Sequence, residues 1–243
     1  GSNPLASRNE EIFTANLSAI GIPTGCRQVT TTTPPNPGDL VNILDLGKRM
    51  SRNGNLIAFD SYAELENSTI TYKTSFATYL YNFTANTFTR IGVRSDADSK
   101  ATGGDLQRYP GFTDYDVAGN PATLVLSTRM NIKADGTVPT TETDGLNPID
   151  ERPVQFYSFN IASPGFTRLT KFPGSGTILL ASSQVLPSLS LRRSAFNLAL
   201  TEFGTSNPDS LSEGYYLYLP SATTQTTATV SFLTGASRLP IHS

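Results

Sequence analysis

The chain has 243 residues, of which 37% are hydrophobic, and its 18 Lys and Arg against 20 Asp and Glu give a net charge of −2. This length suffices for one sizeable core, and all-β folds often reach it as a single domain. The charge is nearly balanced and the sequence contains no run of Lys or Arg, so we expect no nucleic-acid partner. The longest apolar runs, such as residues 177–182, are too short to cross a bilayer, so we also expect no membrane span.

Strand patterns follow one another along the whole chain, while helical periodicity is nearly absent. Short runs rich in β-branched and aromatic residues are bounded by turn formers: NLIAFDS (55–61), TYLYNFT (78–84), ATLVLST (122–128), VQFYSFNI (154–161), AFNLALTEF (195–203) and YYLYLP (215–220). The fold class predicted from these runs is all-β. Their alternating aromatic residues are the predicted core: Phe59, Tyr79, Tyr81, Phe156 and Phe159.

The strand patterns also repeat. Residues 11–30, 78–92 and 155–170 each give a strand, a turn and an Arg close to a Thr, namely Arg27, Arg90 and Arg168. Between these endings lie matching beginnings, each a strand, a polar turn and a second apolar strand. The unit is therefore four antiparallel strands, and repeated sheets of this kind bury both faces by radial packing in a β-propeller.

We therefore expect a β-propeller segment of about three and a half four-stranded blades. The predicted divisions are a tag remnant at 1–2, a partial first blade at 3–33, blades at 34–95 and 96–172, a degenerate blade at 173–233 and a C-terminal tail at 234–243. Since closed propellers typically need at least four blades, we expect a missing domain or a homodimer to complete the ring. The blade with residues 96–172 carries a long loop between its second and third strands.

Two stretches resemble a known bacterial repeat. NEEIFTANLSAIGIPTGCRQVT (9–30) and MSRNGNLIAFDS (50–61) resemble the TolB-like, WD40-like (PD40-type) β-propeller repeat, with Asn53 in place of the usual Asp before Gly54. Residues 90–116 are similar to the connection between blades in the extended form of this repeat. The resemblance implies an exported bacterial protein, secreted or periplasmic.

The usual catalytic residues are scarce. The one histidine, His242, lies next to the C-terminus, and the one cysteine, Cys26, fits a packed or semi-buried thiol better than a reactive one. This composition excludes a His-dependent triad in the body of the chain and zinc sites built from His and Cys. No phosphate-binding loop or nucleophile elbow occurs.

Carboxylates are the remaining candidates for chemistry. Asp96, Asp98 and Asp105 lie in an oxygen-rich stretch that could bind Ca²⁺, although Lys100 interrupts the spacing and the family resemblance explains the stretch as a connector. Asp114 and Asp116 lie near an innermost strand and are the candidates for a glycosidase pair, or equally for an Asx-rich turn.

Long loops on a rigid scaffold are where binding surfaces usually lie. The loop tyrosines Tyr62, Tyr72 and Tyr109 are the candidates for exposed aromatic contacts, together with Asp114 and Asp116. We therefore expect a non-catalytic binding or scaffolding module that engages a protein or glycan through its rim loops. The alternative is the propeller part of a polysaccharide-degrading enzyme or a peptidase.

Overall fold

A computed structural model describes residues 9–44, 49–101, 111–112, 123–172, 186–187, 193–198, 213–218 and 229–232. These parts are almost entirely β-strand, with three short 3-10 turns as their only helical elements. The all-β prediction is thus confirmed. None of the described turns has the length and hydrophobicity to cross a lipid bilayer.

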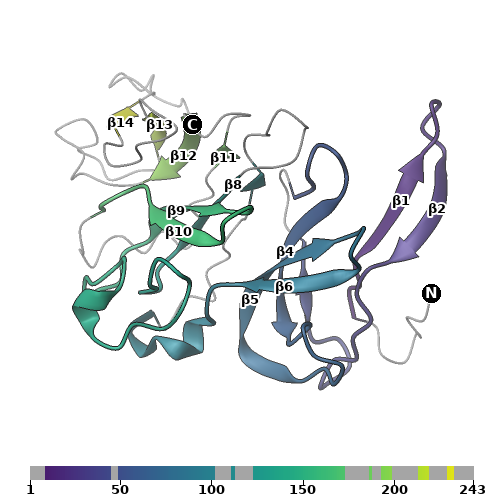
Figure 1. The fold of residues 1–243 in the computed structure, drawn as a ribbon, viewed down its shortest axis with the longest axis horizontal. Helices are drawn as coiled ribbons and strands as arrows, with labels where there is room; N and C mark the ends of the chain where they lie inside the picture. The colour runs from purple at the N-terminus through teal and green to yellow at the C-terminus, as the bar shows by residue number, and fades with distance from the viewer. Residues whose placement is uncertain are drawn as a thin grey trace, which may run out of the picture.

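The strands form four antiparallel sheets that follow one another in chain order (Figure 1). A two-stranded sheet comes first, from β1 (Phe13–Leu17) and β2 (Pro23–Gln28). The second sheet has the order β3 (Asn42–Ile43), β4 (Leu56–Ala63), β5 (Tyr72–Asn82) and β6 (Thr87–Ile91). The third has β7 (Gly111–Phe112), β8 (Thr123–Thr128), β9 (Gln155–Asn160) and β10 (Gly165–Arg168). The fourth has β11 (Leu186–Pro187), β12 (Arg193–Leu198), β13 (Glu213–Tyr218) and β14 (Thr229–Phe232).

The 3-10 turns lie in the connections of this arrangement. Two of them, η1 (Ser95–Ala97) and η2 (Ser99–Ala101), follow β6, and η3 (Glu142–Asp144) lies in the long connection between β8 and β9. Each four-stranded sheet is a simple meander, since sequential strands are neighbours in all three.

A polar turn leads into β4. The Ser51 hydroxyl accepts a hydrogen bond from the Leu56 amide at 2.9 Å and donates to Asn53 Oδ1 at 2.7 Å. The Gly54 amide donates to the Ser51 carbonyl at 3.0 Å, and Gly54 has a φ of +72°, a conformation that side chains with a Cβ rarely adopt. The turn therefore depends on the residue types of this Ser-x-x-Gly sequence.

The β3–β6 sheet is buried on both faces because apolar residues occupy successive positions of β4. Leu56 and Ala58 belong to the core that faces the β7–β10 sheet, while Ile57 and Phe59 belong to the core on the opposite face. That second core also contains Ile12 and Val29, which flank the β1–β2 hairpin. The other buried members of this core are Val41, Ala63, Leu65, Ala77, Tyr79 and Tyr81.

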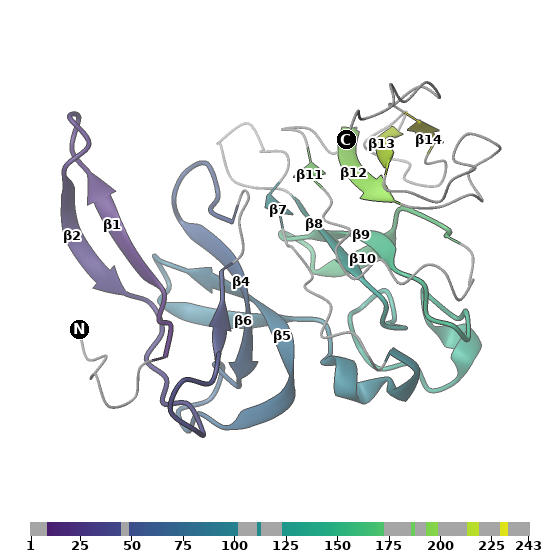
Figure 2. The ribbon, with the colours of Figure 1, turned by 180° about the vertical axis from the view of Figure 1, so that it is seen from behind.

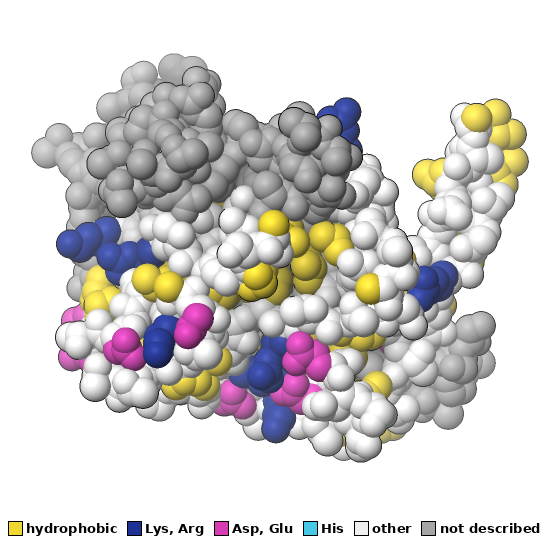
Figure 3. Space-filling view, in the orientation of Figure 1, with side chains coloured by type: hydrophobic (Ala, Val, Ile, Leu, Met, Phe, Trp, Pro, Cys, Tyr) yellow, Lys and Arg dark blue, Asp and Glu magenta, His cyan; other side chains and the backbone are white. Residues whose placement is uncertain are grey.

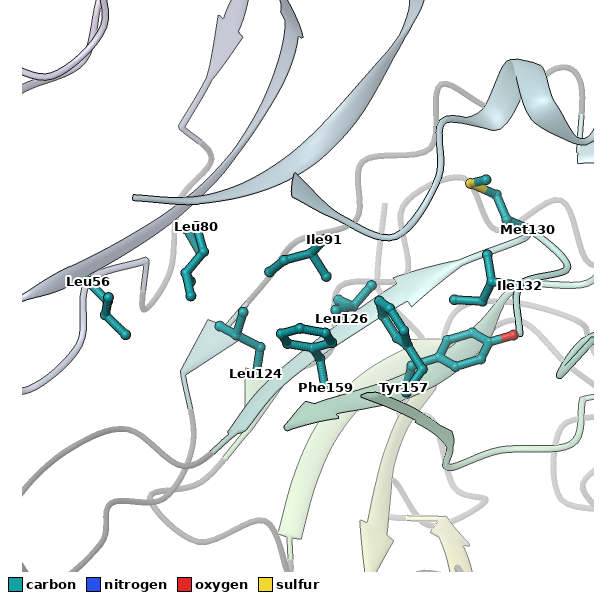
Figure 4. Packing of buried hydrophobic residues seen from close by; sticks show 11 residues of the cluster. Leu56, Leu80, Ile91, Leu124, Leu126, Met130, Ile132, Tyr157 and Phe159 are labelled. Carbon is teal, nitrogen blue, oxygen red and sulfur yellow. The ribbon is translucent and has the colours of Figure 1, made fainter. Parts of the chain in front are cut away.

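The core between the second and third sheets is built from aliphatic and aromatic side chains. Figure 4 shows Leu80 and Ile91 pointing toward the side chains of the facing sheet, among them Leu124, Leu126 and Phe159. All of them are at most 9% exposed. Burial on this scale is the main favourable term in folding, at about 25 cal/mol for each Å² removed from water.

The third sheet is covered on its other face as well. Phe156 of β9 packs edge to face against Phe196 of β12, with 4.7 Å between ring centroids, and against Phe172 at 5.4 Å. The five aromatic residues predicted as core are all buried, none more than 7% exposed. That prediction is therefore confirmed.

The β1–β2 hairpin differs from the other sheets. It projects from one end of the molecule in both views (Figures 1 and 2), and its residues are exposed or half-buried. Cys26 on β2 is exposed, so the prediction of a packed or semi-buried thiol was wrong. The reason is that no second layer covers the hairpin among the described residues, so strand alternation alone does not bury a side chain there.

Candidate functional site

A pocket of about 310 Å³ opens where the chain enters the β3–β6 sheet. We call it the tyrosine pocket, and its lining residues are Pro35, Asp39, Leu40, Val41, Tyr62, Tyr72 and Lys73. It brings together two of the three tyrosines that the sequence singled out. The third, Tyr109, lies outside the described residues.

Strand pairing places the two tyrosines side by side. Tyr62 lies near the end of β4 and Tyr72 begins β5, and in the antiparallel register Ala63 is opposite Tyr72. The register shifts between Ser61 and Ala63, which is the mark of a bulge. The sequence predicted both tyrosines to lie in a loop, but the strands continue through Ala63 and from Tyr72, leaving only residues 64–71 between them.

Tyr62 is held by contacts on two sides. Its amide donates to the Val41 carbonyl at 2.9 Å, which ties β4 to the segment that leads into β3. Its ring packs edge to face on the buried Phe76, with centroids 5.5 Å apart. The ring is therefore fixed while its residue stays half-buried beside the pocket.

Tyr72 is equally well positioned. Its hydroxyl oxygen accepts a hydrogen bond from the Thr33 amide at 2.8 Å. Burial raises the pKa of the Tyr72 phenol, against a smaller opposing effect of that hydrogen bond, so the phenol is neutral at physiological pH. The hydroxyl keeps its own proton to donate.

The remaining walls come from residues 35–41, which sequence reasoning did not single out. Asp39 Oδ2 accepts hydrogen bonds from the Asn36 amide at 3.1 Å and from its side chain at 2.9 Å. These bonds form a local turn that presents Asp39 at the rim. Leu40 is 49% exposed beside it, and Lys73 supplies the one ammonium group of the lining.

A second pocket, of about 230 Å³, lies between η1–η2 and the long connection that contains η3. Its centre is Arg152, whose side chain is 3% exposed and whose φ of +47° is rare for a residue with a Cβ. Arg152 Nε donates to Asp98 Oδ2 at 2.6 Å, and Nη2 donates to Glu142 Oε1. Its Nη1 donates to the carbonyls of Asn147 and Ile149 at 3.0 and 2.7 Å.

The hydrogen bonds and ion pairs of this second pocket join the η1–η2 segment to the long connection between β8 and β9. Lys100 extends the network, because its ammonium lies 2.6 Å from Asp150 Oδ1 and 3.5 Å from Glu142 Oε2. Burial acts to raise the pKa of Asp98, but the hydrogen bond and charge of Arg152 outweigh it and hold the pKa below its usual range. The charges of the pocket are thus paired with one another.

The proposed calcium ligands are distributed unevenly. Asp98 is in the Arg152 network, whereas Asp96 Oδ2 lies 3.5 Å from the Thr74 hydroxyl, and Asp105 is outside the described residues. Among the parts of the chain that the structure describes, no three His, Cys, Asp or Glu residues gather as a metal site would require. Asp114 and Asp116 also lie outside the described residues.

The repeated arginines have different partners. Arg27 Nη2 donates to the Tyr81 hydroxyl at 2.6 Å, and the Arg27 guanidinium lies 5.7 Å from the centre of that ring, so it ties the hairpin to the second sheet. Arg90 donates at 3.1 Å to Glu64, the residue that follows β4. Arg168 donates to the Leu146 carbonyl in the long connection. These contacts brace the scaffold.

Neither protein-family models nor curated protein sequences give a match to this chain. The resemblance to the TolB-like repeat stays a prediction. The tyrosine pocket and the sheets that position it are therefore the features that point to a function.

Proposed function

We propose that this chain is a β-propeller segment that acts as a non-catalytic binding module of an exported bacterial protein. The propeller is supported by three meander sheets of four strands that follow one another along the chain. The second and third sheets have an apolar core on each face, as radially packed blades require. Export is supported by the repeat resemblance.

The ligand that the tyrosine pocket fits best is a neutral glycan. Two fixed phenol rings from adjacent strands supply apolar surface on which the C–H face of a sugar ring can pack. Asp39 and Lys73 supply an acceptor and donors for hydroxyl groups, and their charges offset each other. A volume of about 310 Å³ lies at the lower end of ligand sites and suits one sugar unit of a longer chain.

The observation that carries the proposal is the presence of both tyrosines in one pocket. A protein segment is the other ligand class that rim loops could engage. The balanced charge and the small volume favour the sugar, because a peptide of several residues needs a longer groove. The enzymatic alternative depends on Asp114 and Asp116, and no observation among the described residues favours it.

The test is a screen of neutral and charged oligosaccharides, followed by calorimetric titration of the best ligand. We expect a neutral sugar to bind and Tyr62→Ala to weaken it about three- to tenfold, the equivalent of about 0.7–1.4 kcal/mol of lost aromatic contact. Tyr72→Phe keeps the ring and should lose less than Tyr72→Ala. Val138→Ala, which truncates an exposed side chain outside this pocket, is the matched control and should leave affinity unchanged.

Three outcomes would contradict the proposal. One is that no neutral sugar binds at millimolar concentration. Another is that the control variant weakens binding as much as Tyr62→Ala does. The third is that only peptides bind at these tyrosines, which would assign the site to a protein partner instead.

A further inference from the structure

Tyr72 is held as a hydrogen-bond donor in the wall of the tyrosine pocket. The Thr33 amide donates to its hydroxyl oxygen at 2.8 Å, so that oxygen already serves as an acceptor within the protein. Burial raises the pKa of the phenol, and the negative charge of Glu11 adds to this effect, so the hydroxyl keeps its proton. A phenol in this state offers a ligand its O–H, and the ligand must bring an acceptor.

A polar network fixes the segment that carries Thr33. Glu11 Oε1 accepts hydrogen bonds from the amide and the hydroxyl of Thr32, at 2.5 and 2.9 Å. The Asn42 side chain joins this network, because its Nδ2 donates to the Thr32 hydroxyl at 3.1 Å and its Oδ1 accepts from the Ser61 hydroxyl at 2.9 Å. The segment is thus tied to β3 and β4, and it holds the tyrosine hydroxyl in one orientation.

Asp39 offers the opposite kind of contact from another wall of the pocket. Both hydrogen bonds from Asn36 end on Asp39 Oδ2, so Oδ1 takes no part in that turn and can accept an N–H from a ligand. Tyr72 begins β5, whereas Asp39 belongs to the segment of residues 35–41. A secondary amide has its carbonyl on one side and its N–H on the other, so it is complementary to a donor and an acceptor placed on different walls.

Much of the remaining lining is apolar. Pro35 and Leu40 are aliphatic, and Leu40 is 49% exposed. The Tyr62 ring, fixed on Phe76, adds a flat apolar surface. A plain hexose carries hydroxyl groups around its ring and would lose hydrogen bonds to water where they met this lining. A methyl group gains from the same contact.

The charges around the pocket favour a neutral group. On the face of the molecule in Figure 3, acidic side chains of the described residues lie beside basic ones. Within the pocket lining, Asp39 and Lys73 likewise bring one charge of each sign. An uncharged amide suits this arrangement better than a carboxylate or an ammonium group does.

We propose that the tyrosine pocket selects sugars that carry an N-acetyl group, as N-acetylated hexosamine units of a glycan do. The acetamido carbonyl accepts from the Tyr72 hydroxyl, and the acetamido N–H donates to Asp39 Oδ1. The methyl group lies against Pro35 and Leu40, while the sugar ring packs on Tyr62. This assignment rests on the proposed sugar site and narrows its ligand to one chemical class.

The probes are methyl glycosides in two series, titrated into the intact chain by calorimetry. One series contains glucose, glucosamine and N-acetylglucosamine, and the other contains their galactose counterparts. We expect the N-acetylated member of at least one series to bind about tenfold or more tightly than its parent hexose, because a site built for a hydrogen-bonding group rejects a ligand without it. The free amine lacks the carbonyl and the methyl group and should bind no better than the parent.

A pair of variants assigns the preference to one hydroxyl. Tyr72→Phe keeps the ring but removes the donor, so it should reduce the preference for the N-acetylated sugar about fivefold or more and change the affinity for the parent hexose little. Tyr62→Phe removes the same atom from the neighbouring ring and is the matched control, in which the preference should be unchanged.

Three results would overturn the inference. They are equal binding of the N-acetylated sugar and its parent in both series, a preference for the free amine, and a preference that survives Tyr72→Phe. Equal binding would leave the sugar site itself in place, whereas binding of no glycoside at all would remove the proposed function and this inference together.

Discussion

Arg94 should be far more important for stability than Arg90, although both bind Glu64. Arg94 is 4% exposed and donates from Nε to Glu64 Oε1 at 2.9 Å. Its Nη1 donates to the Ser61 carbonyl at 3.2 Å and to the Ser75 carbonyl. Its Nη2 donates to the Ala63 carbonyl at 3.0 Å and to the Tyr79 hydroxyl at 3.2 Å. One side chain thus joins the end of β4, the start of β5 and the segment that follows β6.

Replacing Arg94 by Met keeps much of the side chain's apolar volume but leaves those carbonyls and part of the Glu64 charge without a partner. Breaking a buried ion pair in this way costs about 3–5 kcal/mol. Arg90 is 35% exposed and its pair with Glu64 spans 3.1 Å near solvent, so Arg90→Met should cost only about 0.2–1 kcal/mol.

Urea unfolding of the two variants and the unmodified chain measures this difference. We expect Arg94→Met to lower the free energy of unfolding by at least 2 kcal/mol more than Arg90→Met does, about the gap between the two estimates. The double variant Glu64→Gln with Arg94→Met should lose less than the sum of the two single variants, because no stranded charge remains. Equal costs for Arg94→Met and Arg90→Met would refute the assignment of Arg94 as the central brace.

Other predictions concern packing, backbone conformation and pH. Leu126→Ala, at a side chain 2% exposed between two sheets, should cost about 2–5 kcal/mol in urea unfolding, whereas Leu17→Ala should change stability by less than about 0.5 kcal/mol. A Cβ at Gly54 would meet nothing within 4 Å, so Gly54→Ala should cost only the strain of its positive φ, about 1–2 kcal/mol, and a neutral result by calorimetry would contradict this. Glu64 and Asp98 have pKa values lowered by arginine against the opposing effect of burial, so their contribution to stability is complete above about pH 5. It is lost as the pH falls through their folded pKa values, and unfolding measured from pH 7 to 3 should therefore show a steeper acid loss than in the Glu64→Gln variant.

Alternation of apolar residues was enough to predict the fold class and the core. Leu56 and Ala58 face one core and Ile57 and Phe59 the other, which follows from successive positions on a strand with two buried faces. The same reasoning failed for Cys26, because a two-stranded sheet without a covering layer buries little. Burial on a strand depends on what lies against it, which the strand's own sequence does not state.

The tyrosine pocket was predictable only in part. Aromatic content singled out Tyr62 and Tyr72, but their proximity depends on the β4–β5 register and its bulge. The contribution of Asp39 depends on how residues 35–41 approach the sheet. The Arg152 network was missed for a similar reason, since Arg152 is 54 residues from Asp98, which the sequence singled out only as a candidate calcium ligand.

The most direct test of the account is the location of the sugar site. In a ¹⁵N-labelled chain titrated with the best neutral oligosaccharide, we predict that amide shifts concentrate at residues 39–41, 62 and 72–73. Those shifts should vanish in the Tyr62→Ala variant, while the signals of the Arg152 network stay unchanged. Saturable shifts that fall elsewhere on the chain, or none at all, would contradict the assignment of the tyrosine pocket as the binding site.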